Sequence, residues 1–254
     1  MPRFRTAYIT GASSGLGAEI ARRLAAGGTR VVLAARREHL LERLAAELRA
    51  AGGAADVAPV DVADGEAAHA EVARWDRELG GLDLVLANAG VGEAHPAQEL
   101  AWPEVERVLR INALGACATL MGGLGCMLPR NGGTLSAVSS LAAYRGFPTS
   151  GAYSASKACV STFLETLQAD LRGTGIRVVD VRPGFVRTPM TAKNTGAMPF
   201  LLEPDEAARR ILRAVRAGRR VYNFPWPMAA LMRFVRILPG AVVDGAVRNA
   251  RSFE

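Results

Sequence analysis

Two kinds of segment alternate along the chain. Short runs made mostly of Val, Leu, Ile and Ala are each followed by a longer stretch in which apolar residues recur at helical spacing between Arg and Glu. Short continuous apolar runs are typical of strands that are buried on both faces of a sheet. We therefore predict seven strands, at residues 6–10, 30–36, 55–62, 82–90, 132–140, 176–184 and 219–224.

The longer stretches predict helices between these strands. They cover residues 16–28, 38–53, 65–79, 102–128 and 204–218, and a further helix carries Tyr153 and Lys157. Strands joined by helices form parallel sheets through right-handed crossovers. The fold class expected is α/β, a doubly wound parallel sheet of about seven strands with helices on both faces. No shift in composition marks a linker, so we expect a single domain over residues 1–254, with a substrate-loop region at 189–203 and an apolar C-terminal extension at 223–254.

Composition narrows the function classes. Half of the 254 residues are apolar and 22% are charged, which is typical of a globular chain. The net charge of +7 comes from arginines spread along helical segments without a nucleic-acid motif, so we expect solvated helix faces and no nucleic-acid partner. Cys117, Cys126 and Cys159 are too few and too badly spaced for a zinc site or a disulfide framework, and we predict no metal. Because no apolar signal region precedes the first strand, a cytoplasmic location is expected.

A glycine-rich turn follows the first predicted strand. The segment "TGASSGLG" (10–17) has glycines at positions 11, 15 and 17, which permit a tight turn and a close approach of the backbone to a pyrophosphate. The helix that begins there offers N–H donors to phosphate oxygens. The spacing differs from G-x-G-x-x-G, and three glycines alone are a weak signal. Their position after the first strand of an alternating chain favours a dinucleotide site over a mere tight connection.

The segment "YSASK" places Tyr153 and Lys157 four residues apart, on one face of a helix. Positive charge beside a phenol stabilises the phenolate, so the pair can bring the tyrosine pKa from about 10 toward neutrality. Taken alone, these five residues more often indicate an amphipathic helix with one exposed lysine and one half-buried tyrosine. Both interpretations stay open at this point.

The motifs taken together resemble the short-chain dehydrogenases/reductases, in their single-domain branch of about 250 residues. The resemblance rests on seven segments in order, which are "TGASSGLG" (10–17), "DV" (61–62), "NAG" (88–90), "IN" (111–112), "SS" (139–140), "YSASK" (153–157) and "PGFVRT" (183–188). It implies a Rossmann-type version of the predicted sheet and hydride transfer between a nicotinamide and a substrate.

The resemblance also implies the catalytic residues. Tyr153 donates the proton to the substrate oxygen, Lys157 polarises Tyr153 and holds the nicotinamide ribose, and Ser140 hydrogen-bonds the substrate oxygen. The spacing from Tyr153 selects Ser140 over Ser139. Asn112 is implied to interrupt its helix and to hold a water in a proton relay to Lys157.

A larger set is implied to bind the cofactor. The glycine-rich turn cradles the phosphates, Asp61 and Val62 bracket the adenine, and Val186 and Thr188 contact the carboxamide. The full set comprises Gly11, Ser13, Ser14, Gly15, Leu16, Gly17, Arg36, Arg37, Asp61, Val62, Asn88, Ala89, Gly90, Tyr153, Lys157, Pro183, Gly184, Val186 and Thr188.

The end of the second strand addresses the form of the cofactor. NAD-preferring relatives carry an acidic residue there for the ribose hydroxyls. This chain has Ala35 followed by Arg36 and Arg37, which resembles an arrangement for a 2′-phosphate and favours NADP(H) over NAD(H). The expected function is that of an NADP(H)-dependent oxidoreductase acting on a carbonyl or secondary alcohol. The alternative is a non-catalytic dinucleotide-binding regulatory or scaffold protein.

Substrate and partners are less sharply indicated. Apolar residues in the loops around the site suggest a small apolar carbonyl or alcohol. The helices at 102–128 and after Tyr153 are apolar on more than one side, so we expect a homodimer or homotetramer. The apolar segment 223–247 is expected to cover the substrate pocket or to join a subunit interface. Contact of Arg233 and Arg236 with a membrane surface is the less favoured alternative.

Overall fold

The computed structural model describes residues 4–92, 94–194, 196–240 and 242. Its centre is a seven-stranded sheet in the order β3-β2-β1-β4-β5-β6-β7, with every neighbouring pair parallel. The strands are β1 (Thr6–Thr10), β2 (Arg30–Ala35), β3 (Ala55–Pro59), β4 (Leu84–Ala87), β5 (Gly133–Val138), β6 (Ile176–Pro183) and β7 (Val221–Phe224). The chain runs outward from β1 to β3 and then returns to place β4 on the other side of β1. Ligands of open α/β sheets bind at such a reversal.

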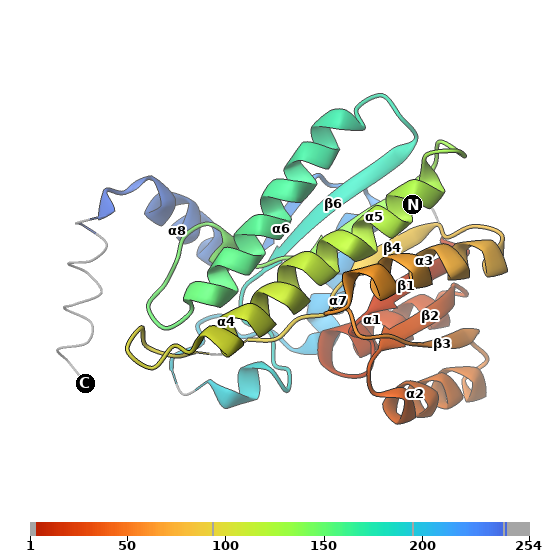
Figure 1. The fold of residues 1–254 in the computed structure, drawn as a ribbon, viewed down its shortest axis with the longest axis horizontal. Coiled ribbons are helices and arrows are strands. Elements are labelled where there is room, and N and C mark those ends of the chain that lie inside the picture. Colours follow the sequence, from red (N-terminus) through yellow and green to blue (C-terminus); the bar gives the residue numbers. More distant parts are fainter. Residues whose placement is uncertain (1–3, 93, 195, 241, 243–254) are drawn as a thin grey trace.

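Helices cover both faces of the sheet (Figure 1). They are α1 (Gly15–Ala26), α2 (Glu38–Ala50), α3 (Gly65–Leu79), α4 (Trp102–Leu109), α5 (Gly115–Met127), α6 (Gly151–Asp170), α7 (Pro204–Arg216) and α8 (Trp226–Ile237). Three shorter helical segments complete the fold. They are the π-helix η1 (Arg110–Leu114) and the 3-10 helices η2 (Leu141–Ala143) and η3 (Thr191–Lys193).

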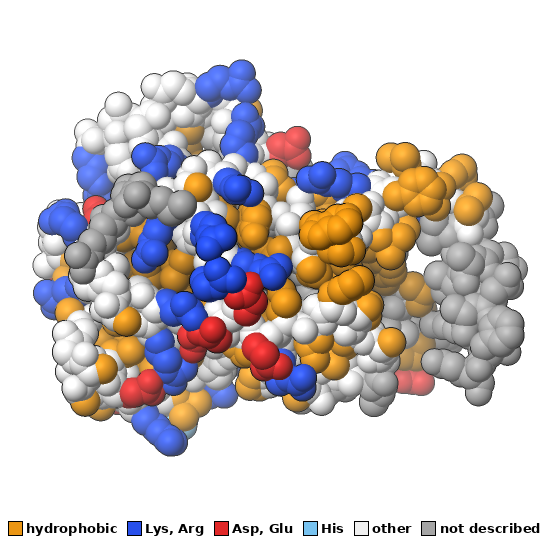
Figure 2. All heavy atoms as spheres, turned by 180° about the vertical axis from the view of Figure 1, so that it is seen from behind, with side chains coloured by type: hydrophobic (Ala, Val, Ile, Leu, Met, Phe, Trp, Pro, Cys, Tyr) orange, Lys and Arg blue, Asp and Glu red, His pale blue; other side chains and the backbone are white. Residues whose placement is uncertain are grey.

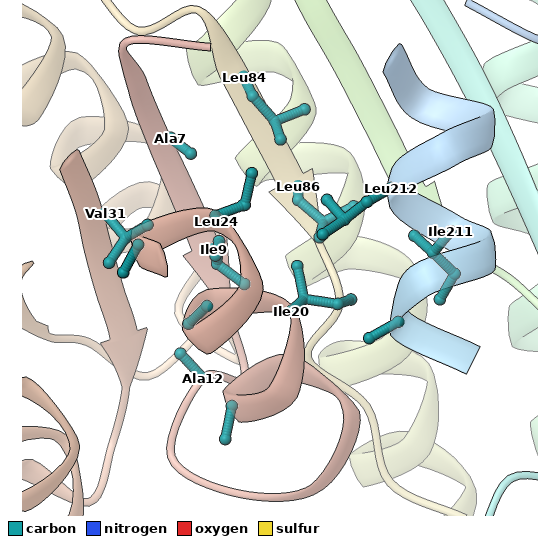
Figure 3. Packing of buried hydrophobic residues seen from close by; sticks show 14 of the residues in the cluster. Ala7, Ile9, Ala12, Ile20, Leu24, Val31, Leu84, Leu86, Ile211 and Leu212 are labelled. Carbon is teal, nitrogen blue, oxygen red and sulfur yellow. The ribbon is translucent and has the colours of Figure 1, made fainter. Parts of the chain in front are cut away.

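Successive residues of each strand pack into different cores, because side chains alternate between the two faces of a sheet. Ile9 and Leu33 join one buried cluster with α1, α2 and α7. Tyr8 and Val32 join the other, with α3, α5 and α6. Figure 3 shows the first cluster, where Ile20 of α1 and Leu212 of α7 meet above β4. This two-sided burial explains why the strands are mostly apolar in sequence.

The stretch from α4 through η1 to α5 is the one helix, among the described residues, long and apolar enough to cross a membrane. It covers Trp102–Met127, with a mean hydropathy of 1.3 in its most apolar window and 61% of that window buried. α5 packs against α3 and against β4 and β5. Its apolar character is therefore largely accounted for by core packing.

The predicted elements can be compared with these bounds. The fold class is confirmed, and each of the seven predicted strands is present, with several ends shorter by one to three residues. The helix predicted at 102–128 is interrupted by η1 at Asn112, as the resemblance implied. The C-terminal extension forms the end of β7 and α8, while residues 241 and 243–254 lie outside the described residues.

Candidate active site

The turn between β1 and α1 is shaped to receive an anion. Gly11 has a φ of 68°, and a Cβ on Gly17 would lie 2.4 Å from the Gly11 carbonyl oxygen, so neither position accepts a side chain. Ser14 stands at the N-cap of α1 without making a side-chain cap. The first N–H groups of α1 are therefore open to phosphate oxygens.

The end of β4 is tied to this turn. Thr10 Oγ1 accepts hydrogen bonds from the backbone N–H groups of Asn88 (3.0 Å) and Ala89 (3.1 Å). Asn88 Nδ2 donates to the Thr10 carbonyl at 3.0 Å. These bonds hold the ends of β1 and β4 together at the point where the sheet order reverses.

A cavity of about 490 Å³ opens at these strand ends. Its lining contains every residue that the resemblance assigned to the cofactor, from Gly11 at the turn to Thr188 after β6. Ser140 and Asn112 are not among the lining residues, but each contacts one of them, Ser140 through Tyr153 and Asn112 through Val91. The glycine cradle, the open helix terminus and the cavity size together fit a dinucleotide.

The catalytic pair lies on α6, one turn apart. Lys157 Nζ is 5.7 Å from the centre of the Tyr153 ring and donates to the Val138 carbonyl oxygen at 2.9 Å. Burial lowers the pKa of Lys157 from 10.5 to about 8, and the carboxylate of Asp180 opposes that change. An ammonium is thus held beside the phenol, in a wall of the cavity.

The pKa of Tyr153 differs from the sequence expectation. Burial raises it, and the hydrogen bond with Ser140 is the interaction that lowers it. Lys157 was expected to provide the lowering, but in the structure without a bound cofactor the loss of solvation is the larger effect. Tyr153 is therefore protonated at neutral pH, which is the form that can donate a proton.

The two adjacent serines after β5 point to different partners. The hydroxyl of Ser139 donates to the Lys157 carbonyl oxygen at 3.1 Å and contacts Ser161 Oγ at 2.7 Å. Ser140 Oγ accepts from the Ala142 backbone N–H at 3.1 Å and also bonds Tyr153. Geometry thus agrees with the choice of Ser140 as the serine next to the phenol.

Asn112 fastens the segment after β4 to the catalytic helix. Its Oδ1 accepts from the Val91 N–H and its Nδ2 donates to the Val91 carbonyl, both at 2.8 Å. The same Nδ2 donates to Ser156 Oγ at 3.1 Å. A π-helix often marks a functional site, because the extra residue turns a side chain out of the helical register. The side chain of Asn112 has a positioning role here, and its role in a water relay stays a prediction.

The two arginines after β2 line the cavity, at the end that the resemblance assigns to the adenosine. Arg37 Nη2 donates to Ser13 Oγ at 2.8 Å and to Ser14 Oγ at 2.9 Å. Arg36 Nη1 lies 3.6 Å from Asp61 Oδ2. Arg37 therefore holds its charge directly beside the glycine-rich turn, while Arg36 holds its charge beside the carboxylate expected near the adenine.

Comparison with known proteins agrees with this geometry. The family model described as short chain dehydrogenase matches residues 5–198. The chain belongs to the short-chain dehydrogenases/reductases. A Myxococcus xanthus protein described as an uncharacterized oxidoreductase is 44% identical over 248 residues, which cover 98% of each chain.

Two solved structures of this family are also similar. A short-chain dehydrogenase/reductase from Burkholderia phymatum in complex with NAD has a TM-score of 0.85 and 26% identity, and the match covers 92% of this chain and 94% of that one. An alcohol dehydrogenase from Thermococcus sibiricus complexed with 5-hydroxy-NADP has a TM-score of 0.77 and 30% identity, covering 87% and 94%. This chain is an oxidoreductase of that family.

Sequence reasoning missed part of the surroundings of this short-chain dehydrogenase site. Asp180 of β6 is buried and bonds Arg182 Nε at 2.7 Å, on the side of the sheet that carries Lys157. A carboxylate inside the apolar run "VVDV" was the available signal. Met228 of α8 packs so close to Gly184 that a Cβ there would lie 2.7 Å from its sulfur. Nothing local in the sequence indicated that contact.

The apolar side chains of the loops expected to form the substrate pocket have three different surroundings. Met190 lines the cavity, and a Cβ on Gly92 would lie 3.2 Å from its sulfur. Tyr144 and Phe147 pack instead against the cluster formed with α8. Phe200 is exposed. The apolar wall of the cavity thus comes from fewer side chains than the loops suggested.

Proposed function

We propose that the protein is an NADP(H)-dependent oxidoreductase that interconverts a small apolar carbonyl compound and the corresponding alcohol. One observation carries the proposal, namely the meeting of Ser140, Tyr153 and Lys157 at a cavity that begins on a glycine-rich turn. The Thermococcus sibiricus relative is described as an alcohol dehydrogenase. That description supports the interconversion of an alcohol and a carbonyl compound as the reaction of this protein.

The chain's own residues account for the proton transfer. A bound nicotinamide supplies the hydride for the carbonyl carbon. Tyr153, kept protonated by burial, donates its proton to the carbonyl oxygen. Ser140 hydrogen-bonds the same oxygen as negative charge develops on it. Lys157 places an ammonium next to the phenol and stabilises the phenolate that remains, and it is positioned to hold the ribose.

The residues at the end of β2 support the phosphorylated form of the cofactor. Arg36 and Arg37 both line the cavity, and Ala35 supplies no carboxylate to repel a 2′-phosphate. A guanidinium meets a phosphate with paired, charge-assisted hydrogen bonds. Solved relatives hold NAD in one case and an NADP derivative in the other, so this preference rests on the arginines.

Assembly and location complete the proposal. We propose that residues 1–254 form one catalytic domain, and that the protein acts in the cytoplasm as a homodimer or homotetramer. Leu114 (58%) and Leu128 (51%) at the two ends of α5 are exposed, which supports a partner subunit on that helix. The contact area is expected to involve α5 and α6.

A substrate panel tests the function. Ketones and secondary alcohols of graded size are assayed by nicotinamide absorbance with NADPH and with NADH. We expect NADPH-dependent reduction of at least one apolar ketone. Tight cofactor binding without turnover on every substrate in the panel would instead support the non-catalytic alternative.

A further inference from the structure

Helix α8 has two faces with different surroundings. Its inner face is packed, since Ala229 and Met232 are buried against Leu141 next to the catalytic serine. Its outer face carries four large apolar side chains in water. The exposed fractions are 78% for Trp226, 58% for Leu231, 56% for Phe234 and 76% for Ile237. The inner face packs beside the site, on Leu141, but the outer face has no partner within the described chain.

Leu231, Phe234 and Ile237 follow one another at a spacing of three residues, which places them on one helix face as an apolar stripe. Trp226 lies on the same side, because it precedes Ile237 by about three helical turns. Figure 2 shows hydrophobic side chains gathered at the end of the molecule that carries α8. Exposed apolar patches of this kind mark contact with another surface. The nature of that surface follows from the charges around the stripe.

Positive charge flanks the apolar stripe. α8 carries Arg233 and Arg236 and contains no acidic residue. Both arginines line a second cavity, of about 410 Å³, together with Arg220 and Arg182. The acidic residues of this cavity are Glu165 and Asp180, and Asp180 is already paired with Arg182. The surroundings of the stripe therefore carry a net positive charge.

The helix is held firmly in this orientation. Arg145 Nη1 donates to the carbonyl oxygens of Val235 (2.9 Å) and Leu238 (2.8 Å), so a cation satisfies the C-terminal end of α8. The guanidinium of Arg236 lies 5.8 Å from the centre of the Tyr144 ring. The outer face is thus presented on a rigid support.

We propose that the outer face of α8 docks on a lipid bilayer that contains anionic lipids. Trp226, Leu231, Phe234 and Ile237 enter the boundary between headgroups and acyl chains, and Arg233 and Arg236 meet the headgroups. An amphipathic helix with arginines beside its apolar face binds membrane surfaces in this way. Because Met228 of the same helix packs against Gly184 in the wall of the cavity, docking brings the catalytic site near the lipid surface.

A second copy of the chain fits this face less well than lipid does. A helix of 12 residues is about 18 Å long and about 10 Å wide, so its outer face buries roughly 200–400 Å² per partner. A stable interface buries about 800 Å² per partner. A two-fold contact would also bring the arginines of both copies close together. Anionic lipid complements them instead.

Vesicle flotation of the full-length protein tests the proposal. We expect binding to vesicles of phosphatidylcholine with phosphatidylglycerol, little binding to phosphatidylcholine alone, and weaker binding as salt rises. Leu231→Ser with Phe234→Ser, and separately Arg233→Glu with Arg236→Glu, should each lower the bound fraction at least tenfold. Cofactor binding by fluorescence confirms that each variant is folded.

Matched pairs elsewhere provide the controls. Leu100→Ser with Phe200→Ser removes two exposed apolar side chains that lie outside α8, and Arg43→Glu with Arg172→Glu reverses two exposed arginines away from α8. Both pairs should bind vesicles like the parent. Absence of parent binding, or equal losses in control and α8 variants, would overturn the proposal. So would an α8 pair that changes the oligomeric state in light scattering and leaves flotation unchanged.

Discussion

Lys157 is a cation in a place that disfavours charge. It is 5% exposed, its ammonium has the Val138 carbonyl as its hydrogen-bond partner, and burial lowers its pKa to about 8. The four-residue spacing to Tyr153 predicted their shared helix face. It could not predict Asp180, which comes from a strand distant in sequence and compensates part of the burial. The spacing along the sequence thus reveals which side chains share a helix face, whereas packing between distant elements sets the pKa of Lys157.

The burial of Lys157 predicts a trade between stability and catalysis. A lowering of the pKa from 10.5 to about 8 corresponds to roughly 3 kcal/mol of destabilisation at neutral pH. Lys157→Met removes this cost but leaves the Val138 carbonyl without its donor, so we expect a net gain of about 1–3 kcal/mol in the free energy of unfolding of the cofactor-free protein. Turnover should be lost.

The low pKa of Lys157 also sets how the stability of the parent changes with pH. Between the folded pKa of about 8 and the unfolded value of 10.5, the unfolded chain binds more protons at Lys157, so the stability of the parent rises with pH in that window. The advantage of Lys157→Met should therefore be full below pH 8 and shrink above it. Urea unfolding at neutral pH and near pH 10 measures this, and a variant less stable than the parent at neutral pH would contradict the account.

The arginines after β2 give a second prediction at this scale. A hydrogen bond to a charged group contributes ~1.5–3 kcal/mol, a roughly 10- to 150-fold effect on affinity. We expect kcat/KM for NADPH to exceed that for NADH by at least an order of magnitude. Ala35→Asp with Arg36→Ala should reverse the order, because it restores an acceptor for the ribose diol and removes one phosphate partner.

A substitution of Arg37 alone tests its contribution separately from that of Arg36. Arg37 already bonds Ser13 and Ser14 beside the glycine-rich turn. Arg37→Ala should therefore weaken the binding of NADPH by at least tenfold and leave the binding of NADH nearly unchanged. Arg43→Ala, exposed on the same helix α2, is the control and should change neither. A parent enzyme that uses both cofactors equally well would contradict the assignment.

At the scale of elements, the spacing of apolar residues predicted where helices lie better than it predicted where a helix is interrupted. The helix expected at 102–128 is divided into α4, η1 and α5. An extra residue in a turn leaves no trace in a segment that is apolar on several sides, so only the resemblance indicated the break at Asn112. The inner face of α8 was equally hidden, because its contacts with Leu141 and Gly184 join distant parts of the chain.

The interruption at Asn112 carries a prediction of its own. Asn112→Ala removes three hydrogen bonds, to the Val91 backbone and to Ser156, and leaves buried polar groups unpaired. We expect a loss of about 1–3 kcal/mol in stability together with reduced turnover. Glu42→Ala, at an exposed position of α2, should leave both unchanged. Denaturant midpoints give the comparison, and equal midpoints for the two variants would argue against the positioning role.

At the scale of the whole molecule, the alternation of strands and helices was enough to predict the architecture. Parallel strands covered on both sides are mostly apolar, and β1 and β4 are buried at every position, whereas β6 also carries the charged Asp180 and Arg182. The pattern does not contain the order of strands, which follows from crossover geometry and packing. It also does not contain the assembly of subunits.

Assembly is therefore tested separately. The exposed ends of α5 favour a partner subunit, and light scattering at micromolar concentration should give the mass of two or four chains. Leu114→Glu with Leu128→Glu should shift the mass toward one chain, because charges would be buried at the interface. A parent that is monomeric at that concentration would contradict the assembly.

The central claim is that Tyr153 donates the proton in carbonyl reduction. Tyr153→Phe removes the phenolic hydroxyl with little change in volume, and a positioned acid contributes on the order of 10²–10⁴ in rate. The decisive measurement is kcat for the parent and for Tyr153→Phe on one ketone from the panel, beside the cofactor dissociation constant of each. The account predicts a fall in kcat of at least 10² with cofactor binding retained. Near-normal turnover in Tyr153→Phe would contradict it.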